Sequence, residues 1–397
     1  MTFDMTAALR DDLPAPAGPW AAAPPYSFVG GHNDGASIPF AGLAEAAVNA
    51  MRDNGPALAA YNLGGSPQGY APLRQFVCDK LGVRAGTPVE PDEVLITSGS
   101  LQALDLVNEA FLRPGDTVIV EQATYGGALS RLERLGVSWV GVDLDDDGID
   151  PTHLGQVLDG LAADGVTPRF LYTIPTIQNP TGSVMPLARR RQILELVRAA
   201  GVAIFEDDCY ADLVWEGERP PTLRALDDGG GQVIYCGSFS KSIAPSLRVG
   251  YLVADPPVIR QLLALKTDAG TGALEQLALA EYGPTNFDTH VEQLMDALQA
   301  KCRVMRQAVA THFPDEVTVT DPKGGIYVWL TFPEGTDTSA LVAPAAAAGI
   351  EFNPGAGWSA EAEWGRRRLR LCFGHPDVET IETGVAELGR IYRESTT

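Results

Sequence analysis

From about residue 92, short hydrophobic runs alternate with segments in which apolar side chains recur every three to four positions. Strands are expected at Val94–Ser98, Thr117–Glu121, Ser138–Val142, Phe170–Ile174, Val202–Glu206, Val233–Cys236 and Arg248–Val253. Helices are expected between them at Leu101–Leu112, Gly127–Leu135, Pro151–Ala162 and Pro186–Ala200. Apolar strands alternating with helices are typical of a largely parallel sheet covered on both faces, so an α/β fold is predicted.

The pattern changes after about residue 287. A long helix is predicted over Phe287–Phe313, followed by few, hairpin-like strands. These strands are expected at 317–320, 326–330 and 367–373, with helices at 338–348 and 376–394. We therefore predict a large domain over residues 46–286 and a smaller α+β domain over 287–397. The segment 1–45 lacks strong periodicity and is expected to form an arm that packs on the small domain.

Composition excludes several classes of protein. No apolar run reaches the length of about 20 residues that a membrane span needs, and no signal-peptide pattern opens the chain. The net charge of −22 argues against nucleic acid as a partner. The five cysteines are scattered and form no CxxC pair, so neither a disulfide framework nor a metal site is indicated. A reducing, cytoplasmic setting is expected.

Polar residues follow five of the predicted strands directly. They are Ser98-Gly99-Ser100, Tyr125, Asn179, Asp207-Asp208 and the stretch from Ser238 to Lys241. Ligands of open α/β sheets bind at the carboxyl ends of the strands. These side chains are therefore predicted to converge on one site.

Lys241 lies at a strand end among small hydroxyl residues. A sheltered amine there is suited to forming a Schiff base, although an ordinary surface lysine fits the local pattern as well. Ser238, Ser240 and Arg248 are all able to donate to a phosphate dianion. A second candidate cradle is Ser98-Gly99-Ser100-Leu101-Gln102, where a strand leads into a helix N-terminus.

Asp207 ends an apolar strand, and a carboxylate in that position needs a partner. A protonated pyridine nitrogen would supply one; a helix cap or a structural ion pair is the alternative. Tyr210, three residues later, is within reach of the same ring. Tyr125 is suited to stacking on a flat ring or to a place in the core, and Asn179 belongs to an Asn-Pro-x-Gly turn.

Six motifs, taken in order along the chain, resemble those of one enzyme family. They are Gly69-Tyr70-Ala71-Pro72-Leu73-Arg74, Thr97-Ser98-Gly99-Ser100-Leu101-Gln102-Ala103-Leu104-Asp105, Gln178-Asn179-Pro180-Thr181-Gly182, Glu206-Asp207-Asp208-Cys209-Tyr210, Ser238-Phe239-Ser240-Lys241 with Arg248, and Leu369-Arg370-Leu371. Over nearly its whole length the chain resembles the fold-type I, class I/II aminotransferases. It is most similar to the branch of 2-aminoadipate and multi-substrate aminotransferases, whose domain also occurs in MocR-type regulators.

The resemblance implies pyridoxal 5'-phosphate (PLP) as cofactor and a homodimer with shared active sites. It implies that Lys241 is the Schiff-base lysine and proton shuttle, and that Asp207 pairs with the pyridinium. Asn179 and Tyr210 would bind the phenolate oxygen, and Tyr125 would stack on the ring. The phosphate would be held by Ser98, Gly99, Ser100, Leu101, Gln102, Ser238, Ser240 and Arg248, together with Tyr70 of the other subunit.

The resemblance also assigns the substrate site. Arg370 would clamp the α-carboxylate of the substrate beside Asn179, although from composition alone it is one more charge next to the basic run 366–368. The segment Gly31-His32-Asn33-Asp34 departs from the family, which usually has apolar and proline residues there. Its polarity suggests a substrate with a polar or cationic side chain, and a solvated turn is the alternative.

The expected activity is transamination between an L-amino acid and a 2-oxo acid by a ping-pong mechanism. Another PLP reaction on the same fold, such as elimination, replacement, cyclisation or decarboxylation, stays open. A PLP-binding regulator is not expected, because the motifs begin by residue 30 and leave no room for a preceding DNA-binding domain. A dinucleotide-binding domain is not expected either, since no GxGxxG follows the first strand.

Overall fold

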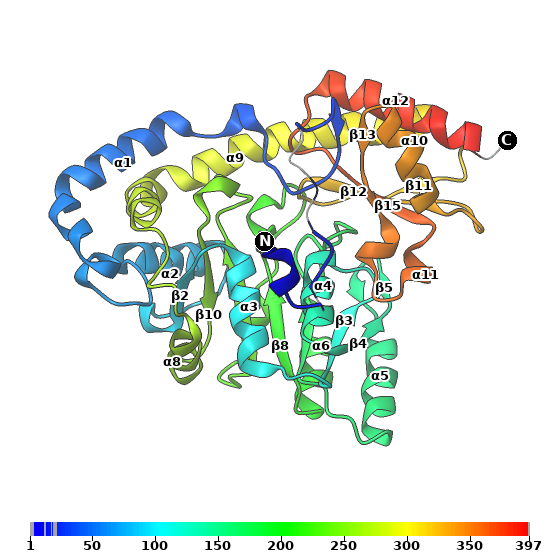
Figure 1. The fold of residues 1–397 in the computed structure, drawn as a ribbon. Coiled ribbons are helices and arrows are strands. Elements are labelled where there is room, and N and C mark those ends of the chain that lie inside the picture. The colour runs from blue at the N-terminus through cyan, green and yellow to red at the C-terminus, as the bar shows by residue number, and fades with distance from the viewer. Residues whose placement is uncertain (1–3, 12, 17, 19–21, 396–397) are drawn as a thin grey trace.

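A computed structural model describes residues 4–11, 13–16, 18 and 22–395 (Figure 1). Its centre is a seven-stranded sheet of order β2-β10-β9-β8-β7-β3-β4. The strands are β2 Val94–Thr97, β3 Thr117–Glu121, β4 Ser138–Val142, β7 Phe170–Thr173, β8 Ala203–Asp207, β9 Val233–Ser238 and β10 Gly250–Val253. All neighbours are parallel except β10, which runs antiparallel to β2 and β9. The predicted mostly parallel α/β fold is confirmed.

Helices cover both faces of this sheet. One face packs on α3 Ser100–Phe111, α4 Gly126–Arg134 and α8 Pro256–Leu265. The other packs on α2 Ala71–Ala85, α5 Pro151–Ala163 and α6 Leu187–Ala199. Strand β10 contributes side chains to both layers, since Leu252 points into the first while Tyr251 and Val253 point into the second. Helices cover both faces, so the central positions of these strands are apolar and their polar residues lie at the strand ends.

A smaller antiparallel sheet of order β11-β12-β15-β14 follows in the chain. Its strands are β11 Thr318–Val319, β12 Tyr327–Thr331, β14 Asn353–Pro354 and β15 Arg368–Cys372. Helices α10 Val342–Ala347 and α12 Val378–Ser395 lie beside it (Figure 1). The N-terminal β1 Tyr26–Ser27 pairs in parallel with β13 Ile350–Glu351, and Phe28 is buried in the same core.

Helix α9 spans Ala273–His312, a run of 40 residues that connects the two cores. The sequence-based start at Phe287 was wrong, because Pro284 lies inside the helix instead of ending it. Apolar residues on both sides of Pro284 explain the continuity: Leu279 and Val291 are buried against the large sheet, and Leu298 against the small one. The expected domain boundary at 286/287 therefore falls within one helix, and the division of the chain stays a prediction.

Two α-helices of the described residues precede residue 92, in a stretch for which no helix was predicted. They are α1 Phe40–Asn54 and α2. α1 lies along the first part of α9 at the edge of the molecule (Figure 1). Among the described residues no helix is both long and apolar enough to cross a membrane.

A buried ionic network fixes the chain that follows β8. The carboxylate of Asp212 lies 2.7 Å from Lys80 Nζ on α2 and 3.3 Å from Arg219 Nη1. Burial raises the pKa of Asp212, but the surrounding Lys80, Arg219 and Arg84 outweigh it and lower that pKa to about 2. Arg219 also reaches Asp208 at 2.8 Å. The network thus ties the loop after β8 to α2 and to the sheet.

Asp212→Ala is expected to lower the free energy of unfolding by about 3–5 kcal/mol, because it leaves the buried ammonium of Lys80 without its partner. Urea unfolding monitored by fluorescence measures the change. Asp288→Ala is the matched control, since Asp288 pairs with Arg84 from a side chain that is 65% exposed. That variant should lose less than about 1 kcal/mol. Equal losses in the two variants would contradict the buried network.

Candidate active site

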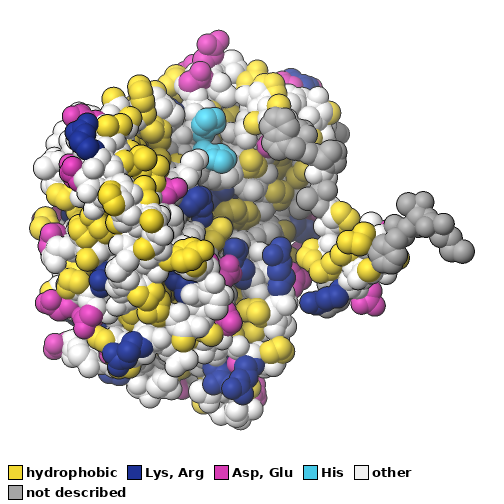
Figure 2. All heavy atoms as spheres, turned by 60° about the vertical axis from the view of Figure 1, so that its left-hand side comes forward, with side chains coloured by type: hydrophobic (Ala, Val, Ile, Leu, Met, Phe, Trp, Pro, Cys, Tyr) yellow, Lys and Arg dark blue, Asp and Glu magenta, His cyan; other side chains and the backbone are white. Residues whose placement is uncertain are grey.

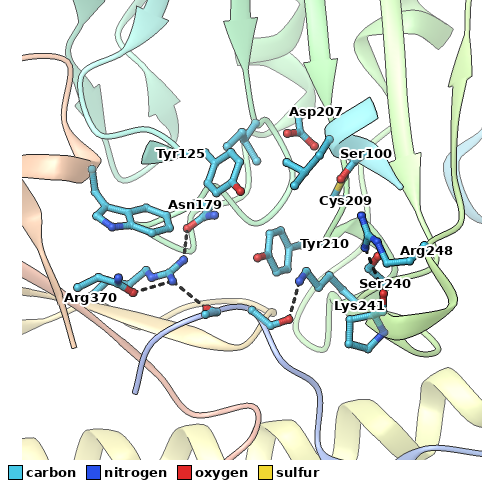
Figure 3. Close-up of a pocket in the computed structure, with 17 residues that line it drawn as sticks. Ser100, Tyr125, Asn179, Asp207, Cys209, Tyr210, Ser240, Lys241, Arg248 and Arg370 are labelled. Atoms are coloured by element: carbon cyan, nitrogen blue, oxygen red, sulfur yellow. Dashed lines mark hydrogen bonds between the residues drawn. The ribbon is translucent and has the colours of Figure 1, made fainter. Parts of the chain in front are cut away.

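A cavity of about 310 Å³ opens at the carboxyl ends of the central strands (Figure 3). It is lined by Gly30, Gly31, Ser100, Leu101, Tyr125, Ile174, Asn179, Asp207, Cys209, Tyr210, Ser240, Lys241, Pro245, Arg248, Asn353, Trp358 and Arg370. Most of these residues come from the loops after β2, β3, β7, β8 and β9. The small sheet and the N-terminal segment supply the others, so the cavity is closed only by the complete fold.

Lys241 projects into this cavity from the loop after β9. Its Nζ donates a hydrogen bond of 2.5 Å to the carbonyl of Gly31, and its own carbonyl accepts one from Asn33 Nδ2 at 3.0 Å. Burial lowers the pKa of Lys241. A lowered pKa increases the fraction of neutral amine, which is the form that attacks a carbonyl carbon.

Asp207 ends β8 at the back of the cavity. Its Oδ2 accepts a 2.7 Å hydrogen bond from the hydroxyl of Tyr172. Its Oδ1 is buried and has no hydrogen-bond partner in the described part of the chain. Burial raises the pKa of this carboxyl group. An orphaned, buried oxygen facing a cavity calls for a cationic N–H donor on whatever binds there.

A dianion cradle lies on another side. α3 begins at Ser100, and its first backbone N–H groups are free of helical partners. Arg248 donates to the carbonyl of Ser98 at 3.4 Å, which holds the guanidinium beside this helix end. Ser238 donates to Ser240 Oγ at 2.9 Å, behind the lining. The helix end, Arg248 and Ser240 together suit a phosphate.

Arg370 on β15 forms the opposite pole. The residue is 2% exposed, and it donates to Asn179 Oδ1 at 3.0 Å, to Asn353 Oδ1 at 2.9 Å and to the carbonyl of Gly30 at 2.8 Å (Figure 3). The indole ring of Trp358 lies 3.6 Å from its guanidinium carbon. No carboxylate of the described chain forms an ion pair with it. A buried guanidinium with neutral acceptors alone is suited to an anionic ligand.

The loop that carries Asn179 is held from below by Glu121. This fully buried carboxylate accepts hydrogen bonds from Thr173 Oγ1 at 2.6 Å, Ile174 N at 3.1 Å and Gln178 Nε2 at 2.8 Å. Burial raises its pKa to about 7. The Asn179-Pro180 peptide bond is cis. Glu121 thus fixes the position from which Asn179 meets Arg370.

Comparison with known proteins agrees with this geometry. The family model described as aminotransferase class I and II matches residues 35–388. This chain belongs to the class I and II aminotransferases. A 2-aminoadipate transaminase of Thermus thermophilus is 37% identical over 368 residues, which cover 92% of this chain and 89% of that protein. An uncharacterised HTH-type transcriptional regulator of Bacillus subtilis is 33% identical over 83% of this chain and 67% of its own length.

A solved aminotransferase structure has the same fold. It is that of LysN, an alpha-aminoadipate aminotransferase of Thermus thermophilus, complexed with N-(5'-phosphopyridoxyl)-L-leucine. The TM-score is 0.85 at 36% identity, over 93% of this chain and 92% of that one. The protein is therefore a PLP-dependent transaminase of fold type I. Its cavity fits the cofactor, since the orphaned oxygen of Asp207 suits a pyridinium and the end of α3 suits a phosphate.

The structure brings most of the predicted site residues of this aminotransferase together. Those that line the cavity are Gly31, Ser100, Leu101, Tyr125, Asn179, Asp207, Tyr210, Ser240, Lys241, Arg248 and Arg370. Ser98, Gly99 and Ser238 lie directly behind the lining. Gln102 is turned away, because its amide accepts from the backbone of Ser98 and donates to Asp268. Tyr70 lies outside the cavity of its own chain.

The structure places residues 32–34, which were predicted to contact the substrate, outside the lining of the cavity. Asp34 does not face the cavity, because its oxygens accept from Lys301 Nζ at 2.9 Å and from Ser37 Oγ at 2.5 Å. Asn33 is buried beneath Lys241 and holds the backbone of that loop. His32 packs edge-on against His375, with ring centroids 5.8 Å apart, and is not among the lining residues. Of this segment, Gly31 alone reaches the cavity.

Six lining residues were not predicted from sequence. They are Gly30, Ile174, Cys209, Pro245, Asn353 and Trp358. Cys209 stands between two predicted residues and Ile174 ends a predicted strand, so position alone would have indicated them. Asn353 belongs to the two-residue strand β14 and Trp358 to the short 3-10 helix that follows it, and neither segment carries a local signal for a site.

Gly99→Ala is expected to weaken PLP binding by about tenfold or more. The added Cβ would overlap the guanidinium of Arg248, at a backbone φ of +81° that favours glycine. Moving that cation removes a charge-assisted hydrogen bond worth about 1.5 kcal/mol. Gly115→Ala is the control, because Gly115 has a φ of +88° and nothing within 4 Å of an added Cβ. Titration of each variant with PLP gives the affinity, and equal affinities would refute the role of Gly99.

Asp34→Ala is expected to destabilise the protein by about 3 kcal/mol, because it strands the ammonium of Lys301. Its KM values should change by one common factor for all amino acids, since Asp34 does not contact the substrate. Thermal unfolding and a set of KM values measure both effects, with Asp34→Asn as the isosteric control. A KM raised selectively for amino acids with cationic side chains would restore the original prediction.

Proposed function

We propose that this transaminase moves the α-amino group between an L-amino acid and a 2-oxo acid in two half-reactions of ping-pong type. Its substrate side chain carries no positive charge. The observation that carries the proposal is Arg370, a buried guanidinium without an acidic partner in the same cavity as Lys241. This pairing suits a molecule with both a carboxylate and an α-amino group.

Binding of the substrate follows from the position of Arg370. Arg370 receives the α-carboxylate as a salt bridge, with Trp358 stacked against its guanidinium. Asn179 and Asn353 hold the guanidinium in place before the substrate arrives. A clamp that is already oriented needs little rearrangement, so more of its binding free energy is available for positioning the α-carbon.

Proton transfer is assigned to Lys241. Bound PLP supplies an electron sink for the α-carbon, as it does in PLP enzymes generally. Asp207 would hold the pyridine nitrogen in its protonated form, Tyr210 and Asn179 would donate to the phenolate oxygen, and Tyr125 would cover the ring. Nζ of Lys241 takes the proton from the α-carbon of the substrate and delivers it to the cofactor carbon. This transfer requires the neutral amine, which burial favours.

The charge of the lining argues against a cationic side chain on the substrate. Among the described residues that line the cavity, Asp207 is the one carboxylate, and the cofactor uses it. Asp34, the residue first expected to bind a cation, is bonded to Lys301. Leu101, Pro245 and Ile174 give the cavity apolar surface instead. These contacts favour an uncharged side chain.

A second copy of the chain is proposed as the partner. Several apolar side chains stand exposed on and after α1, including Phe40 at 76% and Tyr61 at 83%. Figure 2 faces this side of the molecule and shows hydrophobic side chains gathered over it. An apolar surface of this kind is typical of a subunit interface. A homodimer formed there also accounts for Tyr70, which the resemblance assigns to the neighbouring active site.

The proposal is tested with the PLP-loaded protein and a panel of amino acids, without any 2-oxo acid. Transamination predicts a shift of the visible cofactor band and one equivalent of 2-oxo acid per site. Donors with neutral side chains should react far better than Lys or Arg. Lys241→Ala should react at least about a hundredfold more slowly, because the proton shuttle is gone.

Two results would overturn the proposal. Repeated release of ammonia without a second substrate would indicate elimination instead of transamination. A preference for Lys or Arg as donor would refute the assignment of the side chain while leaving transamination intact.

A further inference from the structure

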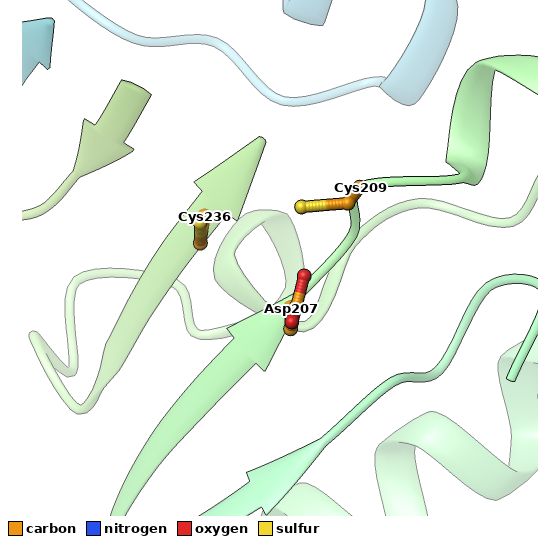
Figure 4. Close-up of side chains that lie close together, drawn as sticks. All are labelled: Asp207, Cys209 and Cys236. Atoms are coloured by element: carbon orange, nitrogen blue, oxygen red, sulfur yellow. The ribbon is translucent and has the colours of Figure 1, made fainter. Parts of the chain in front are cut away.

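Two cysteines and an aspartate lie together at the floor of the cavity (Figure 4). One ligand atom each from Asp207, Cys209 and Cys236 lies within 4.8 Å of the other two. The strand register explains the cluster, because Asp207 of β8 is paired with Cys236 of β9 and Cys209 follows two residues later. Transamination as described above makes no use of either thiol.

We propose that the chain without PLP binds a thiophilic divalent cation, such as Zn²⁺, at Asp207, Cys209 and Cys236. PLP and the cation exclude each other, because both require the carboxylate of Asp207. The site is thus a second, competing use of the cofactor cavity. Transamination itself does not depend on it.

The donor set suits such a cation. Two thiolates and one carboxylate match the ligands that zinc takes in proteins, with three protein ligands and an open fourth position for water. At zinc–ligand distances of about 2.0–2.3 Å, tetrahedral ligand atoms lie roughly 3.3–3.8 Å apart. The cluster therefore needs to contract by about 1 Å, which small side-chain rotations supply. Both thiols release their protons to solvent on binding.

Access and competition follow from where the atoms lie. Asp207 and Cys209 both line the cavity, so a hydrated cation reaches them from solvent, and Cys236 closes the site from beneath at 1% exposure. Asp207 Oδ1 has no hydrogen-bond partner in the described structure. Either a pyridinium or a metal ion satisfies that oxygen, and the cavity does not offer a second carboxylate for the other.

No equivalent cluster exists elsewhere in the part of the chain that the structure describes. The remaining cysteines, Cys78, Cys302 and Cys372, are buried and belong to no such group. They serve as internal controls. If the cation bound to any single thiol, replacing Cys78 would weaken binding as much as replacing Cys236.

The experiment uses Cd²⁺ as the probe, because its bonds to thiolates absorb in the ultraviolet. The full-length protein is prepared with PLP and, after treatment with phenylhydrazine and gel filtration, without it. Circular dichroism checks that the latter is folded. We expect one Cd²⁺ per PLP-free chain with thiolate absorption, and none per PLP-loaded chain. Chelation by EDTA should restore PLP binding without any reductant.

Variants locate the site. Cys236→Ser and Cys236→Ala should each weaken Cd²⁺ binding by at least about tenfold. Tenfold is the lower limit, because the loss of a residue that only supports a metal ligand already costs about that much. Cys78→Ser should bind as the wild type does. Equal affinity in the Cys236 and Cys78 variants, or Cd²⁺ binding unaffected by PLP, would overturn the proposal. The competition with PLP is measured on the wild type, so it decides the matter even where a variant fails to fold.

Discussion

The contact between Arg370 and Asn179 is the one on which the rest of the site depends. It joins the small sheet to the loop after β7, and it is made by a guanidinium that is 2% exposed. Neutral oxygens from three segments accept hydrogen bonds from its Nη1 and Nη2, and its buried Nε has no partner in the described structure. The fold thus keeps a desolvated positive charge in place, and no acidic side chain of the described chain neutralises it.

The opposite side of the cavity carries an unpaired carboxylate in place of an unpaired cation. Asp207 holds a carboxylate oxygen without a partner, and Glu121 and Asp212 brace the loops on either side of it. Each unsatisfied group costs stability in the absence of a ligand. The aminotransferase therefore carries two complementary unsatisfied groups, one proposed to bind the cofactor and one proposed to bind the substrate. Binding relieves both, which is how a preorganised site converts folding free energy into affinity.

Sequence patterns predict the half of the site that is built by the central sheet. Lys241, Asp207 and Asn179 each lie at or after the end of a strand. The carboxyl ends of parallel strands meet at one edge of the sheet, so locating the strands is enough to predict that these residues converge. The residues of the small domain are different. Arg370 was assigned through a family motif, and Trp358 was missed, because their approach depends on how distant segments pack. Asp34 shows the same limit, since its partner Lys301 lies 267 residues away.

The bond between Lys241 and the carbonyl of Gly31 has a consequence for how the protein is assembled. The same Nζ that is proposed to carry the cofactor donates a hydrogen bond to the N-terminal segment, which Arg370 also contacts through Gly30. Once Nζ is joined to the cofactor, it no longer offers that hydrogen bond in the same form. Cofactor loading and the docking of the N-terminal segment are therefore thermodynamically linked, each altering the equilibrium of the other by the same factor. The docking of this segment therefore depends on whether Nζ of Lys241 is free.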